Sequence, residues 1–288
     1  MKTTATPTTT ANTTVSTTTG TTASTTTGTT AAARRMTSLG RAELTLLGRN
    51  KNNLFIALLM PLLMIFVLRS SVAQMDSDAL PLGVAGATLV GGTGMVLVLV
   101  VYMGLVSAYV ARREELVLKR LRTGEARDVE ILAGAALPSA AIALLQCAVL
   151  TVGGIAVLDV PAPGRPDLLV LGLVAAVVLL TGLAAVTTAI TRNVESAGLT
   201  TLPFFLVSSM GSGMFVPREA LPDTVASVCA LLPMSGVMEF VRAGWFGVSG
   251  GAGGVDTGDL LAAALNTLAW SVITVFAVRR WFRWEPRR

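Results

Sequence analysis

One short stretch of the chain, residues 111–130, concentrates the side chains that could take part in chemistry. It reads ARREELVLKRLRTGEARDVE and holds six of the 22 Lys and Arg residues and five of the 17 acidic residues. Long apolar segments lie on both sides of it. Such a density of charge is too costly to place in hydrocarbon, and its excess of Lys and Arg marks it as a cytoplasmic loop. The chemistry that these residues offer is ion pairing and hydrogen bonding with another surface.

The same stretch has features of a short helix. Glu115 precedes Lys119 by four residues, an orientation in which opposite charges stabilise a helix. Leu118 and Leu121 give it an apolar stripe, and Gly124 is a common helix stop. We therefore interpret it as an amphipathic helix held beneath the membrane by two spans. A solvated basic loop that touches anionic lipid fits the spacing equally well.

Composition excludes most catalytic and metal chemistry. The chain has no histidine, which excludes a histidine base and His-containing triads. Its two cysteines, Cys147 and Cys229, lie in or beside apolar segments, and no cluster of Cys with acids has metal-ligand spacing. The three lysines are Lys2, Lys51 and Lys119, and none follows a glycine as a P-loop requires. We expect no catalytic residue, cofactor or metal on this chain.

The elements that must position the charged stretch are membrane spans. The chain has 288 residues, of which 52% are hydrophobic and 14% charged, and its mean hydropathy is +0.69. A soluble domain averages about 25% charged residues, so these values predict a polytopic membrane protein. The net charge of +5 is explained by basic cytoplasmic loops and requires no nucleic-acid partner.

Apolar segments of helical length predict an all-α protein with six transmembrane helices. The segments are 54–68, a span within 81–110, 131–158, 168–191, 196–216 and 260–278. With this order, the segments on one side of the membrane carry 18 Lys and Arg residues and those on the other side carry four. The positive-inside rule then places both termini in the cytoplasm.

Two regions precede the first predicted span. Residues 1–33 contain eighteen Thr residues and few apolar ones, so we expect a disordered cytoplasmic tail ahead of a membrane domain of residues 34–288. Residues 36–50 are loosely amphipathic. They are expected to form an elbow helix in the membrane interface, or else a simple cytoplasmic lead-in.

The segment after the fifth predicted span is too polar to be an ordinary span. It nevertheless holds two apolar pieces, 224–232 and 235–245, on either side of Pro233. These pieces predict a re-entrant outer hairpin of two short helices that dips into the outer leaflet. Within the second piece, Glu239 and Arg242 are three residues apart and are expected to pair on one helix face.

The predicted spans contain no paired carboxylates and no buried Lys or Arg. Carriers that are coupled to protons or sodium ions usually place ionisable groups at this depth. The pattern therefore disfavours a gradient-driven carrier and indicates that energy for any transport comes from another subunit.

Three motifs resemble one known family. They are the charged stretch at 115–125, ELVLKRLRTGE; the segment 211–217, GSGMFVP, with Leu221-Pro222 and Leu232-Pro233 after it; and the ending 280–286, RWFRWEP. In this order they resemble type-2 ATP-binding-cassette (ABC) transporter permeases, closest to actinobacterial drug-resistance exporters. The chain departs from the family pattern where Leu116 and Val117 replace a Gly-Thr pair.

The resemblance implies a six-helix exporter subunit in the bacterial plasma membrane. Such a subunit dimerises with a second permease, identical or different, and docks a separate P-loop ATPase that carries the ATP and Mg²⁺. Its cargo would be an amphipathic drug, antibiotic or lipid-like compound. The residues implied to contact the ATPase are Glu114, Glu115, Leu118, Lys119, Leu121 and Arg122. Those implied to form the outer hairpin or gate are Gly211, Gly213, Pro217, Pro222, Pro233, Glu239 and Arg242.

Two other functions fit the same residues. The chain could be a membrane scaffold or sensor that uses the charged stretch to bind a partner without ATPase activity. It could also be a gradient-driven secondary transporter, in spite of its apolar spans. Transport that depends on a co-produced ATPase distinguishes the exporter subunit from both.

Overall fold

The structure, a computed structural model, describes residues 83–116, 128–214, 221–248 and 254–282, with the single positions 59 and 63. Within these ranges the regular elements are helices, and one isolated bridge joins Val248 and Val255. The elements in chain order are α3 (Gly83–Val96), the π-helical segment η2 (Leu97–Met103), α4 (Gly104–Glu114), α6 (Asp128–Val157), α7 (Pro166–Ile190), α8 (Val194–Gly211), α9 (Asp223–Ala230), α10 (Pro233–Phe246) and α11 (Thr257–Trp281). The all-α fold class is confirmed for this part of the chain.

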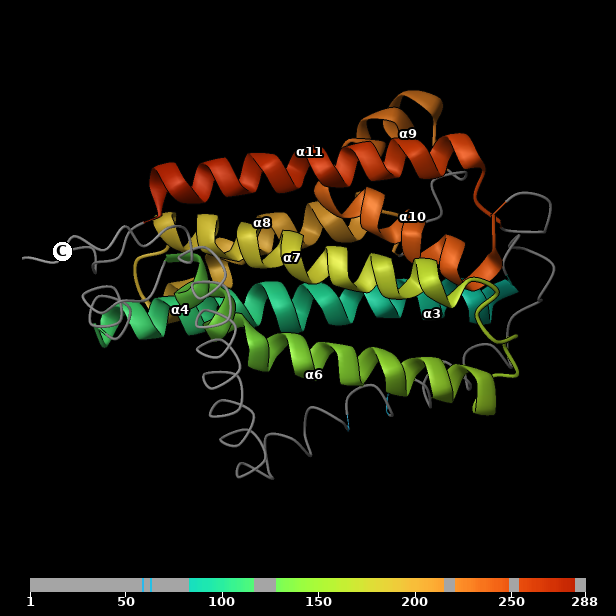
Figure 1. The fold of residues 1–288 in the computed structure, drawn as a ribbon, viewed down its shortest axis with the longest axis horizontal. Helices are drawn as coiled ribbons and strands as arrows, with labels where there is room; N and C mark the ends of the chain where they lie inside the picture. The colour runs from blue at the N-terminus through green and yellow to red at the C-terminus, as the bar shows by residue number, and fades with distance from the viewer. Residues whose placement is uncertain are drawn as a thin grey trace, which may run out of the picture.

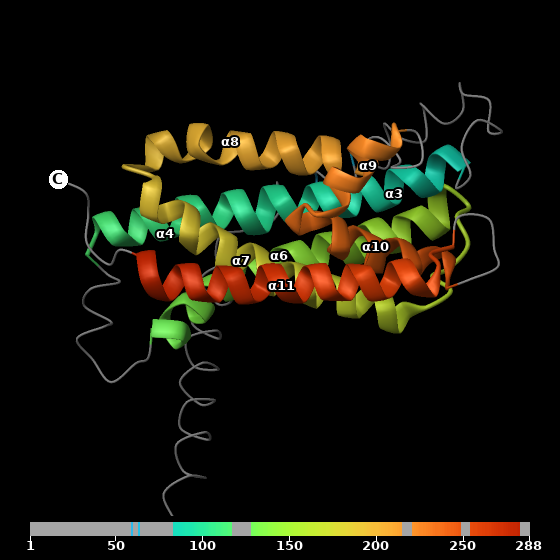
Figure 2. The same ribbon diagram turned by 90° about the horizontal axis from the view of Figure 1, so that it is seen from above.

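The long helices form a bundle with two ends (Figure 1). We call one the island end, because the charged stretch, an island of charge between two spans, meets the bundle there, where α4 ends at Glu114 and α6 begins at Asp128. α7 and α11 also end there, at Ile190 and Trp281, and α8 begins there at Val194. We call the other the far end, where α7 begins at Pro166 and α11 begins at Thr257. Figure 2 shows α8 on one side of the line formed by α3 and α4, and α11 on the other side.

Four helical stretches in the described residues are long and apolar enough to cross a membrane. They are Ala85–Glu114, Val129–Val157, Pro166–Ile190 and Thr257–Trp281. The chain is therefore a multi-pass membrane protein. The first predicted span, the elbow at 36–50 and the tail at 1–33 lie outside the described residues, so six spans and cytoplasmic termini remain predictions.

The fifth predicted span corresponds to α8, which is not among those four stretches. It has 18 residues instead of the 21 predicted at 196–216, and at 1.5 Å per residue it is about 27 Å long, less than a typical hydrocarbon core. Its mean apolar character is lowered by a set of hydroxyl side chains at Ser196, Thr200, Thr201, Ser208 and Ser209.

The second span is longer than predicted and forms the centre of the bundle. Its helix runs through η2 to Glu114, so residues 111–114 of the charged stretch continue a membrane helix and do not begin a separate one. It is the most buried of the four spans, and Leu97, Val101 and Leu105 are fully enclosed. Its glycines allow close packing, because a Cβ on Gly91 would clash with the carbonyl oxygen of Met214.

The short helices predicted around Pro233 are confirmed as α9 and α10, which meet at an angle of 94°. That the pair dips into the outer leaflet stays a prediction, but the two helices differ in their surroundings. Twelve of its 14 residues are buried, whereas α9 buries none. Figure 1 shows α10 between α7 and α11. Glycines permit this position: a Cβ on Gly244 would lie 2.6 Å from the backbone of Leu169, and one on Gly236 would lie 2.5 Å from the carbonyl oxygen of Ala263.

Side-chain hydrogen bonds lie at two of the connections. At the island end, Asn193 caps α8 reciprocally with Ser196, so the turn between α7 and α8 is short and tightly bonded. At the far end, Arg165 donates two hydrogen bonds to the carboxylate of Asp167, at 3.0 and 2.8 Å. These bonds raise the pKa of the Arg165 guanidinium. The loop before α7 also hydrogen-bonds to the end of α10, through Gly164 N and Arg165 N.

Candidate coupling site

Two of the six predicted ATPase-contact residues lie in the described part of the chain. Glu114 is the last residue of α4 and Glu115 follows it, and both are exposed at the island end. The other four, at 118, 119, 121 and 122, lie outside the described residues. The charged stretch is thus bounded by the end of α4 and the start of α6, and its contact role remains a prediction.

The adjacent residue, Arg113, is enclosed in the bundle, with only 1% of its surface exposed. Its Nη1 donates to the carbonyl oxygen of Thr188 at 2.6 Å, and its Nη2 donates to those of Thr191 at 2.7 Å and Arg192 at 3.2 Å. We call this set of three bonds the Arg113 clasp. It joins the last turn of α4 to the end of α7 and to the turn before α8.

The end of α7 provides the acceptors that the clasp requires. The last carbonyl groups of a helix have no partner within the helix, and the helix dipole gives that end partial negative charge. A planar guanidinium presents several donors at once and stays charged when buried, so an arginine can satisfy these carbonyls together. The clasp therefore stabilises α4 and α7 against each other at the island end.

Two tyrosines on the same face of the central helix extend the connection. The Tyr109 hydroxyl donates to the carbonyl oxygen of Leu132 in α6 at 2.9 Å. The Tyr102 hydroxyl lies 3.0 Å from Thr187 Oγ1 in α7, and its ring centroid lies 4.4 Å from that of Phe204 in α8. A displacement of the end of α4 would thus act on α6, α7 and α8.

Arg113 lies one residue before the end of the span Ala85–Glu114, so its burial does not touch the expectation about ionisable groups deep in the membrane; it shows that one charge of the charged stretch is turned inward. The sequence assignment ended the second span at residue 110 and counted Arg113 among the exposed charges. A signal was available in the helical register, because Tyr102, Leu105, Tyr109 and Arg113 recur at helical spacing along one face. Extending that register by one turn would have placed Arg113 on the buried side.

The predicted gate residues lie near the α9–α10 bend. Gly211 is the last residue of α8, and a Cβ there would lie 2.3 Å from Leu232 Cδ1. Gly213 has a φ of 77°, a conformation that L side chains rarely adopt. Pro222 immediately precedes α9 and Pro233 begins α10, while Pro217 lies outside the described residues. The structure thus brings Gly211 to the bend, but a gating role for these residues is untested.

The predicted pair in α10 is confirmed. Arg242 Nη1 lies 4.0 Å from Glu239 Oε1, and both side chains are largely enclosed. This pair lies on a helix inside the bundle, not in a loop at the surface.

Sequence reasoning missed the residues that complete the α9–α10 bend. A break between helices leaves carbonyl groups without partners, which hydrocarbon cannot satisfy. Asn266 Nδ2 in α11 donates to the carbonyl oxygens of Ala230 at 3.2 Å and Leu232 at 2.9 Å. Trp270 Nε1, one turn later, donates to that of Leu231 at 2.8 Å. The available signal was a polar Asn inside an apolar span, four residues before a Trp.

Searching the described residues for groups of three or more Cys, Asp or Glu that could hold a metal ion finds none. The groups described above are charged and polar side chains that hydrogen-bond between helices. They include no arrangement of a nucleophile with a base.

Comparison with known proteins identifies the family. A family model described as "ABC-2 type transporter" matches residues 34–246, which is more than half of the chain. The search of curated proteins found no match. The match includes the central helix, the charged stretch, the Arg113 clasp and the α9–α10 bend. The chain therefore belongs to the ABC-2 type transporter family and is a permease subunit of an ABC transporter.

Proposed function

We propose that the chain forms the membrane pathway of an ABC exporter and that a separate P-loop ATPase docks on its charged stretch. The ATPase supplies the ATP and Mg²⁺ sites, and a second permease subunit, identical or different, completes the pathway. The far end then faces outside the cell and both termini lie in the cytoplasm. The cargo is an amphipathic compound, a drug, an antibiotic or a lipid-like molecule.

The observation that carries this proposal is the position of the Arg113 clasp. It lies directly before the predicted contact residues, Glu114 and Glu115, and it bonds the end of the central helix to α7 and the α8 turn. Closure of an ATPase bound at the charged stretch would move the end of α4, and the clasp would carry that movement to α7 and α8. Such movement biases an equilibrium between two access states.

The proposed roles differ along the chain. In the charged stretch, Leu118 and Leu121 fill an apolar groove of the ATPase, while Lys119 and Arg122 set its orientation. At the other end of the pathway, the α9–α10 bend with Gly211 and Gly213 acts as the gate. Residues 34–288 form the permease domain, and the Thr-rich tail is outside it.

A pull-down from membranes tests the docking. The tagged chain is co-expressed with the ATPase subunits encoded beside it, and the eluate is assayed for bound ATPase and for ATP hydrolysis. Leu121→Asp is expected to remove the ATPase without loss of membrane insertion, because a carboxylate cannot enter an apolar groove without a large desolvation cost.

Thr123→Asp is the matched control, because it adds the same charge outside the apolar stripe and is expected to retain the ATPase. Equal co-purification of wild type and Leu121→Asp would refute the docking site. A well-folded chain that binds no ATPase and transports only along an ion gradient would instead support a secondary transporter. Binding of a partner without transport would support a scaffold.

A further inference from the structure

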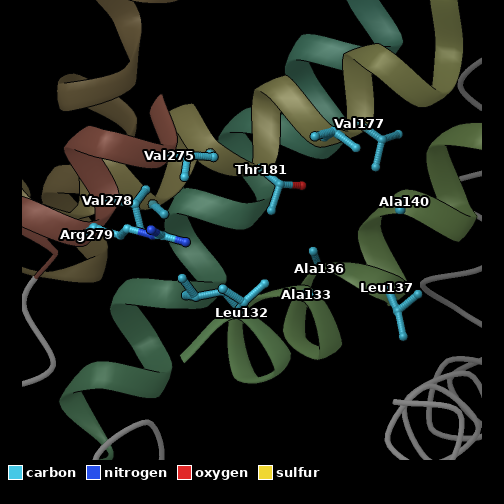
Figure 3. A pocket seen from close by; sticks show the side chains of 14 residues that line it. Leu132, Ala133, Ala136, Leu137, Ala140, Val177, Thr181, Val275, Val278 and Arg279 are labelled. Carbon is cyan, nitrogen blue, oxygen red and sulfur yellow. The ribbon is translucent and has the colours of Figure 1, made fainter. Parts of the chain in front are cut away.

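An apolar groove opens between α6, α7 and α11, towards the island end (Figure 3). Its cavity volume is about 420 Å³, which lies within the range of about 300–1,000 Å³ typical of small-molecule sites. The side chains used below are Leu132 and Ala136 from α6, Thr181 and Val178 from α7, and Val275 and Arg279 from α11. Apart from Thr181 and Arg279, the lining is apolar.

The floor of this groove is a face of α7 that its neighbours leave uncovered. The side chain of Val178 is exposed there, and so is that of Val174 one turn earlier. α11 is held close to α7 behind the groove, since a Cβ on Gly182 would lie 2.9 Å from Thr274 Oγ1. In a membrane this face meets acyl chains, and no hydrophobic driving force requires another helix to cover it.

A positive charge lies at one end of the groove. Arg279 is exposed, and Figure 3 shows its guanidinium extending from α11 over the groove, towards Leu132. Among the described residues no carboxylate pairs with it. The neighbouring Arg280 and Trp281 are exposed in the same turn, and this combination of basic and aromatic side chains is typical of a membrane–water interface.

These observations point to a ligand with an anionic head and an apolar tail. A guanidinium binds phosphate through two parallel hydrogen bonds, and an unpaired one at the interface attracts anionic lipid. Farther into the groove, the Thr181 hydroxyl is buried and has no hydrogen-bond partner among the described residues. The next residue of α7, Gly182, lies level with Thr274 of α11. Thr274 precedes Arg279 by five residues, so at 1.5 Å per residue Thr181 is about 8 Å deeper in the groove than Arg279.

We propose that the groove is a binding site for one anionic phospholipid. Its phosphate binds Arg279, and an acyl chain lies on Val178 between α6 and α11. The inference needs only the placement of the chain in a membrane. The lipid-binding proposal can therefore be right or wrong independently of ATPase docking and export.

Native mass spectrometry of the purified full-length protein, with any subunit that co-purifies, tests this site. The probes are phosphatidylglycerol and phosphatidylcholine with identical acyl chains. We expect one phosphatidylglycerol per chain to be retained in preference to phosphatidylcholine. A single Arg near a lipid surface contributes about 1 kcal/mol, so Arg279→Gln should weaken phosphatidylglycerol binding about fivefold. Arg280→Gln, which removes the same charge from a residue that does not line the groove, should leave it nearly unchanged.

A second pair of variants tests the apolar part. Val178→Trp fills the groove from an exposed position and should displace the lipid, whereas Val152→Trp, on an exposed part of α6 outside the groove, should not. Equal binding of the two lipids, or an equal loss with Arg279→Gln and Arg280→Gln, would overturn the proposal. So would a change in oligomeric state with Val178→Trp at unchanged lipid content, because the groove would then be an interface between copies.

Discussion

At the scale of single residues, a few polar side chains satisfy backbone groups that the membrane would leave without partners. Arg113 donates hydrogen bonds to three carbonyl groups at the end of α7 and in the turn after it. Asn266 and Trp270 together donate to three more at the α9–α10 bend. Each of these side chains lies on a different helix from the carbonyls it serves. They therefore set how helices are held relative to one another, in addition to stabilising them.

Replacing Arg113 by Met should destabilise the protein. The change removes hydrogen bonds from a charged donor, each with a typical contribution of about 1.5–3 kcal/mol, and leaves buried carbonyls unsatisfied. We expect a loss of at least about 2 kcal/mol in the free energy of unfolding, measured by denaturant titration in detergent. Arg192→Met removes the same charge from an exposed side chain of the same turn and should change stability by less than about 0.5 kcal/mol. Similar stability for both variants would mean that the clasp does not hold α4 to α7.

Replacing Trp270 by Phe should loosen the α9–α10 bend. The ring is largely kept, but the Leu231 carbonyl loses its donor, and a typical hydrogen bond contributes about 0.5–1.5 kcal/mol. Faster amide hydrogen exchange in residues 223–246 is the expected result. Trp281→Phe, at an exposed position, serves as the control. Unchanged exchange in the first variant would show that the bend does not depend on this bond.

At the scale of elements, the spans could be predicted from length and hydropathy. The burial of an element by contacts with other helices could not. The predicted spans at 131–158, 168–191 and 260–278 agree within three residues with α6, α7 and α11 at all six ends. These helices face lipid on one side, so their apolar character is visible in the sequence alone. The burial of α10 depends instead on how Gly236 and Gly244 meet other helices, which no local pattern records.

The difference between local patterns and tertiary contacts also explains how much of the candidate site could be predicted. The density of charge at 111–130 predicted where a partner would bind, but not which charge is turned inward. Arg113 is buried because the carbonyls at the end of α7 lie beside it, and they are 75 to 79 residues away in the sequence. The position of Arg113 in the helical register could be predicted from the sequence, whereas the carbonyl groups that accept its hydrogen bonds could not.

Replacing Gly244 by Ala should displace α10 from α7. The added Cβ would lie 2.6 Å from Leu169 N, a backbone atom that cannot rotate away, and overpacking of this kind typically costs about 1–3 kcal/mol. We expect a lower thermal unfolding temperature in detergent. Gly198→Ala is the control, because nothing lies within 4 Å of its Cβ position and alanine favours a helix. A wild-type unfolding temperature for Gly244→Ala would contradict the close packing described for α10.

At the scale of the whole molecule, the island end is hydrogen-bonded across helices, and the α9–α10 bend lies against the middle of α11, at Asn266 and Trp270. The charged stretch, the clasp and the start of α8 lie at one end, and α8 runs from there to the α9–α10 bend, where Gly211 meets Leu232. One continuous helix thus connects the proposed docking site to the proposed gate. This arrangement suits a subunit that receives movement at one membrane surface and passes it to the interior of the bundle.

Uptake of a fluorescent amphipathic dye into inside-out membrane vesicles tests the central claim, that ATPase movement reaches the pathway through Arg113. Vesicles contain the chain with its co-expressed ATPase, and uptake and ATP hydrolysis are measured together. We predict ATP-dependent uptake for wild type and Arg192→Met. For Arg113→Met we predict that ATP hydrolysis continues at a similar rate while uptake is lost. Uptake by Arg113→Met at the wild-type rate, or uptake that needs an ion gradient but no ATP, would contradict this account.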